Sequence, residues 1–217
     1  MNAVLQTSRL SKVFGSFKAL DDVSIRIESG RIQALIGENG AGKSTLLRTI
    51  AGLLRPTFGT VTVFGERPTE HCDRIGYMSH AAMLYDELTG IENLRYFGSL
   101  YRTRACIAPE EAMRATGLDP ALSRPVGQYS QGMRQRSSLA RVLLPQPDLL
   151  LLDEPFSNMD AASARQMLAL LAGIRAQGRT IILTTHQRDL AAPLADAFVT
   201  MQAGSVISVE QQVGATA

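Results

Sequence analysis

Four residues of the segment GENGAGKST, namely Gly37, Gly42, Lys43 and Ser44, have the types and the spacing that bind phosphate. They match the pattern G-x-x-x-x-G-K-[ST], in which glycines let backbone N–H groups converge on phosphate oxygens. Lys43 is then placed to reach the terminal phosphates of a nucleotide, and the Ser44 hydroxyl to ligate Mg²⁺. A glycine-rich turn without a ligand is the alternative, but a strand pattern precedes the segment and a helix pattern follows it.

A second element of this kind lies in YSQGMRQR, from Tyr129 to Arg136. Ser130 and Gly132 stand where a helix is expected to begin, and a helix N-terminus attracts anions because its backbone N–H groups are unpaired. The length of 217 residues fits one sizeable domain. One such domain has no evident need of two phosphate-binding elements.

Two carboxylates, Asp153 and Glu154, follow the apolar run LLLL. A carboxylate at the end of a buried strand costs free energy unless a positive charge compensates it, and Mg²⁺ at the neighbouring loop would do so. Asp153 is then expected to orient the metal through its water shell, and Glu154 to polarise an attacking water as general base. The alternative is that the pair caps a helix at a turn.

Strands and helices alternate along the chain and must position these residues. Strands are expected over residues 23–28, 32–37, 60–65, 149–153 and 180–185. Helices are expected over residues 43–52, 161–177 and 187–195, the second with Asp160 as its N-cap and Gly178 at its end. His186 ends the last strand, at the edge where open α/β sheets bind ligands. It is expected either to contact a γ-phosphate or to be a hydrogen-bonded structural histidine.

The middle third of the chain has a different pattern. From about His80 to Arg141 the signals are helical, with no convincing strand. Thr89 and Glu92 form a capping box, and a second helix in PEEAMRAT ends at Gly117. The chain is therefore expected to be an α/β core interrupted by a helical insertion.

The composition excludes several classes of protein. The net charge of +2, from 22 basic and 20 acidic residues, gives no general electrostatic case for binding nucleic acid or a membrane surface. Cys72 and Cys106 have no metal-binding spacing, which favours a reduced intracellular protein over a disulfide. Because no apolar run approaches the roughly 18 residues that span a bilayer, and no signal sequence is evident, we expect neither secretion nor a membrane span.

Taken together, GENGAGKST, YSQGM, LLLLDEP, SNMD and His186 have the order and spacing of ATP-binding cassette (ABC) ATPases, which the chain resembles over essentially its whole length. The resemblance implies an α/β P-loop NTPase fold with a mostly parallel core sheet, an N-terminal antiparallel β-subdomain and an inserted helical subdomain. It also implies one domain over residues 1–217. Residues 1–79 and 142–210 would form the catalytic core, 80–141 the helical signature subdomain and 211–217 a tail.

The family forms head-to-tail dimers, in which the signature serine and glycine of one subunit cap the ATP held by the other. The resemblance therefore gives the second phosphate-binding element a role, and implies ATP and Mg²⁺ as ligands. The catalytic residues that it implies are Glu154, His186 and His80, and the metal ligands are Ser44, Asp153 and His80. The nucleotide-binding residues that it implies are Phe14, Gly37, Glu38, Asn39, Gly40, Ala41, Gly42, Lys43, Ser44, Thr45, Ser130, Gln131, Gly132 and Asp160.

Some positions leave their roles open. Phe14 matches the aromatic residue that stacks on adenine, and the alternative is an ordinary turn or core phenylalanine. Gln131 and Met133 replace the glycine and the glutamine that the signature usually has. His80 replaces a glutamine that touches Mg²⁺ and the attacking water, and a neutral imidazole is a poorer partner for a hard metal ion.

The resemblance also implies partners and a location. We expect a homodimer or paired cassette, integral-membrane permease subunits bound through the helical subdomain, no nucleic acid, and a peripheral position on the cytoplasmic face of the inner membrane. Residues 80–101 resemble the haem-exporter ATPases of cytochrome c maturation, and their aromatic side chains either line a groove for a permease helix or pack inside the insertion.

The expected function is therefore the ATP-hydrolysing subunit of an ABC membrane exporter, with haem as one candidate cargo. The alternatives are a drug or polysaccharide exporter, a soluble ABC ATPase acting on ribosomes or DNA, and a P-loop switch or kinase without a shared site.

Overall fold

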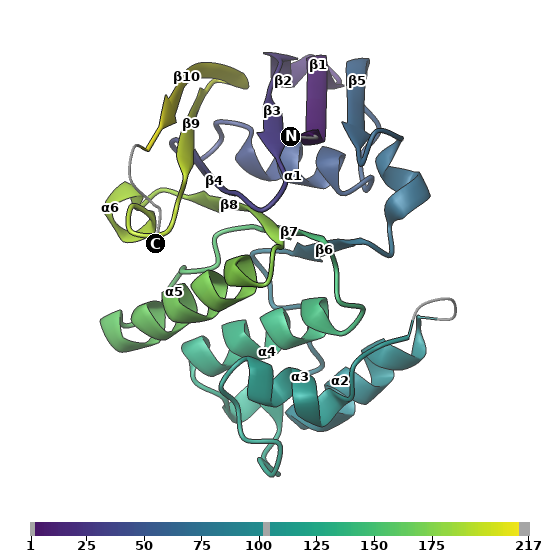
Figure 1. Ribbon diagram of the computed structural model, residues 1–217, viewed down its shortest axis with the longest axis vertical. Coiled ribbons are helices and arrows are strands. Elements are labelled where there is room, and N and C mark those ends of the chain that lie inside the picture. The colour runs from purple at the N-terminus through teal and green to yellow at the C-terminus, as the bar shows by residue number, and fades with distance from the viewer. Residues whose placement is uncertain (1–2, 102–104, 213–217) are drawn as a thin grey trace.

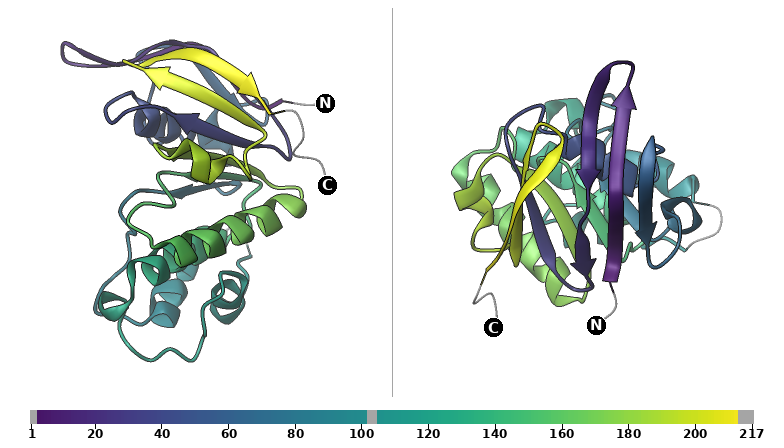
Figure 2. Two further views of the ribbon diagram at one scale, coloured as in Figure 1. Left: turned by 90° about the vertical axis from the view of Figure 1, so that its left-hand side faces the viewer. Right: turned by 90° about the horizontal axis from the view of Figure 1, so that it is seen from above.

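The computed structural model describes residues 3–101 and 105–212, which form two sheets and a group of helices. In Figure 1 the antiparallel strands lie at the top, the main sheet crosses the middle, and three helices, α2, α3 and α4, lie at the bottom. Figure 2 shows the same order of layers from the side. This is the α/β architecture that the sequence predicts.

The main sheet has six strands in the order β10-β9-β4-β8-β7-β6. The strands are β4 (Ile32–Ile36), β6 (Ile75–Met78), β7 (Leu149–Leu152), β8 (Thr180–Thr185), β9 (Ala197–Gln202) and β10 (Ser205–Gln211). All neighbouring pairs are parallel except β9 and β10, so the mostly parallel core is confirmed. The carboxyl ends of β4, β6, β7 and β8 consequently share one edge, where ligands of open α/β sheets bind.

The central strands β4, β7 and β8 are buried along their whole length because both of their faces are covered. Leu149 and Leu151 of β7 belong to one core cluster with α1 (Lys43–Ile50), whereas Leu150 and Leu152 belong to a second with α5 (Ala161–Ala176). All four side chains are fully buried. A run such as LLLL is therefore the pattern of a strand buried on both sides.

The N-terminal antiparallel sheet is also confirmed. It consists of β1 (Ala3–Phe14), which pairs with β2 (Phe17–Val23), β3 (Arg26–Glu28) and β5 (Phe58–Val63). The strand expected over residues 23–28 is divided between the end of β2 and β3. Helix α1 packs beneath this sheet through Leu46, Leu47 and Ile50.

The helices next to the main sheet follow their sequence signals with one exception. Asp160 caps α5, whose buried residues Ala164, Met167, Leu171 and Ile174 recur at the spacing of one helix face. The helix expected over residues 187–195 is wrong in length, because α6 spans only Arg188–Ala191. Pro193 explains the difference, since proline has no backbone N–H to donate to the carbonyl group four residues before it.

Three helices make up the predicted insertion, namely α2 (Gly90–Ser99), α3 (Pro109–Ala115) and α4 (Gln131–Leu143). Thr89 and Glu92 form the predicted capping box. Apart from residues 102–104, which the structure does not describe, residues 80–141 contain no strand. The helices share a small core around Leu94, Met113 and Leu144, and α4 also packs on the main sheet. The division into subdomains at residues 80 and 141 stays a prediction.

None of the helices in the described ranges is both long and apolar enough to cross a bilayer.

Gly76 sets how closely α4 approaches β6. A Cβ atom on Gly76 would lie 2.6 Å from Cγ1 of Val142 and 2.8 Å from Cγ of Pro147. We therefore expect Gly76→Ala to lower the free energy of unfolding by about 1–3 kcal/mol, because the packed layer must shift. Denaturant unfolding of the chain without ligand measures this change.

Gly173 in α5 provides the matched control, because it is exposed and a Cβ atom there would meet nothing within 4 Å. Gly173→Ala should raise the free energy of unfolding by about 0.5–1 kcal/mol through helix propensity. Equal effects of the two substitutions would contradict the packing argument.

Candidate functional site

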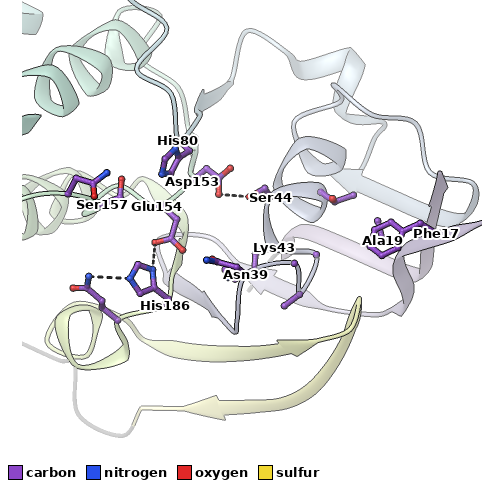
Figure 3. A pocket seen from close by; sticks show the side chains of 16 residues that line it. Phe17, Ala19, Asn39, Lys43, Ser44, His80, Asp153, Glu154, Ser157 and His186 are labelled. Atoms are coloured by element: carbon purple, nitrogen blue, oxygen red, sulfur yellow. Dashed lines mark hydrogen bonds and ion pairs between the residues drawn. The ribbon is translucent and has the colours of Figure 1, made fainter. Parts of the chain in front are cut away.

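A cleft of about 470 Å³ opens at the carboxyl edge of the main sheet. Figure 3 shows side chains from β2, from the start of α1 and from the loops after β4, β6, β7 and β8 around it. Its lining residues are Phe17, Ala19, Asn39, Gly40, Ala41, Gly42, Lys43, Ser44, Thr45, His80, Asp153, Glu154, Ser157, Asn158, His186 and Gln187.

The loop between β4 and α1 requires glycine for close packing as well as for its backbone angles. Gly42 has φ 98°, and a Cβ atom there would lie 2.5 Å from the carbonyl oxygen of Ala19. A Cβ atom on Gly37 would likewise collide with the carbonyl oxygen of Met201. The spacing of glycines in the motif therefore lets the loop lie against β2 and β9 while residues 39–45 line the cleft.

Lys43 holds this loop in its curved form. Its Nζ atom donates hydrogen bonds to the carbonyl oxygens of Gly37, at 2.6 Å, and Glu38, at 3.0 Å. Only 6% of the residue is exposed. Because the partners are neutral carbonyl groups, the charge of this ammonium is compensated only by dipoles, and an incoming phosphate can pair with it.

Asp153 ends β7 and is buried, with 2% of its surface exposed. Its Oδ1 atom accepts hydrogen bonds from the hydroxyl groups of Ser44, at 2.9 Å, and Thr184, at 2.8 Å. No helix begins at this turn, since the next one starts at Ala161. The alternative that Asp153 and Glu154 cap a helix is therefore wrong.

Glu154 and His186 come together across the cleft. Oε2 of Glu154 lies 3.2 Å from Nδ1 of His186, and the Glu154 side chain is 14% exposed. The carboxylate is accessible from the cleft rather than sealed in the core. A general base needs this access to the water that it activates.

Two further side chains extend the polar lining. Ser157 is 8% exposed, and its Oγ atom has no hydrogen-bond partner among the described residues. Such an orphaned polar atom fits a cleft that takes a polar ligand. His80, in the loop after β6, also lines the cleft and lies near Asp153 in Figure 3.

Tyr77 of β6 lies behind these groups, and the sequence did not indicate it. Its hydroxyl accepts a hydrogen bond of 3.4 Å from Nε of Arg48. Burial raises the pKa of Tyr77 above its ordinary value, so the hydroxyl stays neutral at physiological pH. No signal in the short segment IGYM separates this tyrosine from an ordinary strand residue.

Seven of the predicted nucleotide-binding residues do not line the cleft of their own chain, namely Phe14, Gly37, Glu38, Ser130, Gln131, Gly132 and Asp160. Phe14 is 47% exposed, and the ammonium of Lys12 lies 5.0 Å from its ring centroid. Phe17, across the hairpin from Phe14, lines the cleft instead.

Four of these residues, Ser130, Gln131, Gly132 and Asp160, gather where α4 and α5 begin. Ser130 caps α4 by accepting a hydrogen bond from Met133 N at 3.3 Å. Asp160 caps α5 by accepting one from Ser163 N at 2.8 Å, and this hydrogen bond lowers the pKa of Asp160. A Cβ atom on Gly132 would lie 2.5 Å from Oγ of Ser163, so the two helix starts are in contact.

Comparison with known proteins gives a consistent result. A family model described as ABC transporter matches residues 20–157. The ABC transporter ATP-binding protein NatA of Bacillus subtilis is 37% identical over 88% of this chain and 80% of its own length. The daunorubicin/doxorubicin resistance ATP-binding protein DrrA of Streptomyces peucetius is 37% identical over 94% of this chain and 64% of its own length. A fluoroquinolone export ATP-binding protein of Mycobacterium tuberculosis is 38% identical over 88% of this chain and 65% of its own length.

Solved structures share the fold. The structure of an ATP-binding subunit of an ABC transporter superposes with a TM-score of 0.82 at 30% identity, covering 96% of this chain and 90% of that one. A dimeric ATP-binding cassette described as bound to ADP and Pi superposes with a TM-score of 0.86 at 24% identity, covering 97% and 99%.

The position of Lys43 predicts a large effect on phosphate binding. Lys43→Met should weaken ATP binding by roughly 10- to 100-fold, because a charge-assisted hydrogen bond in a desolvated site is lost. Displacement of a fluorescent ATP analogue measures the affinity. Lys18→Met is the control, since this exposed lysine pairs only with Asp21, and it should change the affinity by less than about twofold. Similar losses in both variants would mean that the lysine in the loop has no special role.

Proposed function

The chain belongs to the ABC transporter family of ATP-binding proteins, and from this premise we propose that it hydrolyses ATP as the nucleotide-binding subunit of a membrane exporter. The observation that carries the proposal is the position of Glu154, whose carboxylate lies beside His186 in the same cleft as Lys43 and Ser44. A phosphate-binding loop alone supports nucleotide binding, but hydrolysis also needs a base next to the terminal phosphate.

The residues present fit a Mg²⁺ ion. The hydroxyl of Ser44 and the buried carboxylate of Asp153 are hard oxygen donors that already lie 2.9 Å apart. We propose that these two residues hold the ion together with His80, whose imidazole is the less suitable donor. When bound, the ion supplies charge that neutralises the phosphate oxygens during phosphoryl transfer.

The remaining steps belong to the side chains of this chain. Lys43 pairs with the terminal phosphates, and the backbone N–H groups of residues 37–45 hold the phosphate chain. Glu154 accepts a proton from the attacking water as the water oxygen adds to the γ-phosphorus, while the bond from the γ-phosphorus to the bridging oxygen breaks and ADP leaves. Nδ1 of His186 lies 3.2 Å from the Glu154 carboxylate, so this side chain fixes the orientation of the carboxylate. We propose that His186 also contacts the γ-phosphate.

We propose that two chains pair head to tail around two ATP molecules. The argument is that Ser130, Gly132 and Asp160 lie outside the cleft of their own chain, at the joined starts of α4 and α5. Helix starts with a serine cap can accept a phosphate from elsewhere. The dimeric cassette described with ADP and Pi has the same fold.

An aromatic surface on the helical part supports a membrane partner. Tyr85, Tyr96 and Phe97 pack edge to face or stacked, with centroids 5.2–6.1 Å apart, yet Tyr85 is 47% exposed and Tyr96 43%. Met83 and Leu100 beside them are 61% and 58% exposed. We propose that this surface receives a helix of the permease, which places the chain peripherally on the cytoplasmic face of the inner membrane.

Two observations bear on the cargo. Haem rests on the resemblance of residues 80–101 alone, whereas the relatives named above include exporters of fluoroquinolones and a protein for daunorubicin resistance. Loss of the gene in its host should reduce covalent haem in c-type cytochromes if haem is the cargo. Unchanged haem staining together with new drug sensitivity would favour a drug exporter. A role on ribosomes or DNA lacks an electrostatic basis at a net charge of +2.

The assignment of the general base predicts a trapped dimer. Glu154→Gln should reduce kcat roughly 100- to 10,000-fold while ATP still binds, because the amide cannot accept the proton. Sedimentation velocity with Mg-ATP should then show an ATP-dependent dimer. The double variant Glu154→Gln with Ser130→Arg should remain a monomer, because the arginine blocks the signature serine. Hydrolysis by Glu154→Gln at the native rate would refute the assignment of Glu154 as the base. A dimer of the double variant would refute the proposal that two chains share each ATP site.

The cleft lining predicts which aromatic residue stacks on adenine. Phe17→Ala should weaken ATP binding by roughly tenfold, the typical worth of one stacked base, and leave inorganic tripolyphosphate binding unchanged. Phe14→Ala is the matched variant, because Phe14 flanks the same turn and is the residue indicated by the family resemblance. A larger loss for Phe14→Ala would show that the resemblance identifies the stacking residue and the cleft lining does not.

A further inference from the structure

Thr184 connects the two carboxylate residues of the site, although neither the motif nor the resemblance singles it out. It lies on β8 and is fully buried, with 0% exposure. Its hydroxyl donates a hydrogen bond of 2.8 Å to Oδ1 of Asp153 and accepts one of 2.8 Å from the backbone N–H of Glu154. One hydroxyl group therefore contacts both the proposed metal ligand and the main chain of the proposed base.

The direction of both hydrogen bonds follows from chemistry. A backbone N–H can only donate, so the Thr184 oxygen must accept from Glu154. An ionised carboxylate can only accept, so the single hydroxyl proton must point to Asp153. The hydroxyl thus has one orientation that satisfies both partners. Rotation of the hydroxyl away from this orientation breaks at least one of the two bonds.

Glu154 needs this support because of its backbone conformation. Its φ angle is 52°, in the left-handed region that residues with side chains rarely adopt. The turn is closed on the other side by a hydrogen bond of 3.1 Å from Ser157 N to the Glu154 carbonyl oxygen. Thr184 fixes the N–H of the same residue, so the two bonds together hold the direction in which the Glu154 side chain leaves the backbone.

We infer that Thr184 is a positioning residue, which couples the placement of Asp153 to the orientation of Glu154. This inference rests on the proposed function, because it assumes that Glu154 is the base. Without the hydroxyl, Asp153 loses a donor and the Glu154 turn loses its anchor, while the phosphate loop keeps all its contacts. The chemical step should therefore be impaired and ATP binding retained.

A purely structural role for a buried threonine is the competing explanation, and β8 contains a matched control. Thr180, at the other end of the strand, is 1% exposed, and its Oγ1 atom accepts a hydrogen bond of 3.0 Å from Gly30 N. Thr180→Val removes a hydroxyl that is just as buried and that, like the Thr184 hydroxyl, accepts a backbone N–H. Thr180 does not line the cleft.

The test compares Thr184→Val, Thr184→Ser and Thr180→Val with the wild type. Thr184→Val keeps the shape and should lower kcat of ATP hydrolysis about 10- to 100-fold, as expected for a misplaced catalytic group, with KM within about threefold. Thr184→Ser restores the hydroxyl and should recover kcat to within about threefold of wild type. Thr180→Val should match wild type within about twofold. Wild-type kcat in Thr184→Val, or an equal loss in Thr180→Val, would overturn the inference.

Amide hydrogen exchange provides a readout that does not depend on hydrolysis. The Glu154 N–H should exchange at least about tenfold faster in Thr184→Val, and at the wild-type rate in Thr184→Ser and Thr180→Val. Unchanged exchange in Thr184→Val would also overturn the inference. If the wild type binds ATP but hydrolyses none, the proposed function fails, and the exchange rates still decide whether Thr184 anchors Glu154.

Discussion

The burial of the Asp153 carboxylate is the constraint on which the rest of the site depends. A nearly inaccessible negative charge is tolerated only where donors or a cation compensate it. Here the donors are Ser44 at the start of α1 and Thr184 on β8, so one carboxylate joins three elements that are distant in sequence. The parallel order of β4, β8 and β7 brings those elements to one edge. The sheet topology therefore determines which polar groups meet in the cleft.

The sequence predicted the parts of this arrangement whose signals are local. The apolar run LLLL indicated β7 and the β-branched, largely apolar segment TIILTT indicated β8, as is typical of strands covered on both faces. The glycine spacing indicated the loop before α1, and Asp160 marked the start of α5. These features are determined by neighbouring residues, so a single sequence is enough to find them.

Other parts depend on contacts that no local pattern encodes. β6 is only IGYM, and its place at the edge of the sheet depends on the close approach of Val142 and Pro147 to Gly76. Thr184 looks like any β-branched strand residue until the register of β8 against β7 brings it to Asp153. Phe14 and Phe17 flank one turn, and only the packed hairpin shows that Phe17 faces the cleft. The shortened α6 is different, because Pro193 could have been recognised from the sequence.

The contact between Gly132 and Ser163 also determines the electrostatic potential of one surface. Because Gly132 has no side chain, α4 and α5 begin side by side, and each helix start carries about half a positive charge. The ionised Asp160 lies at this point and offsets part of that potential. An approaching polyanion therefore gains from two helix dipoles but is repelled by one carboxylate. Attraction and repulsion both grow with the charge of the anion, so the carboxylate at the joined helix starts weakens the binding of a triphosphate more than that of a singly charged anion.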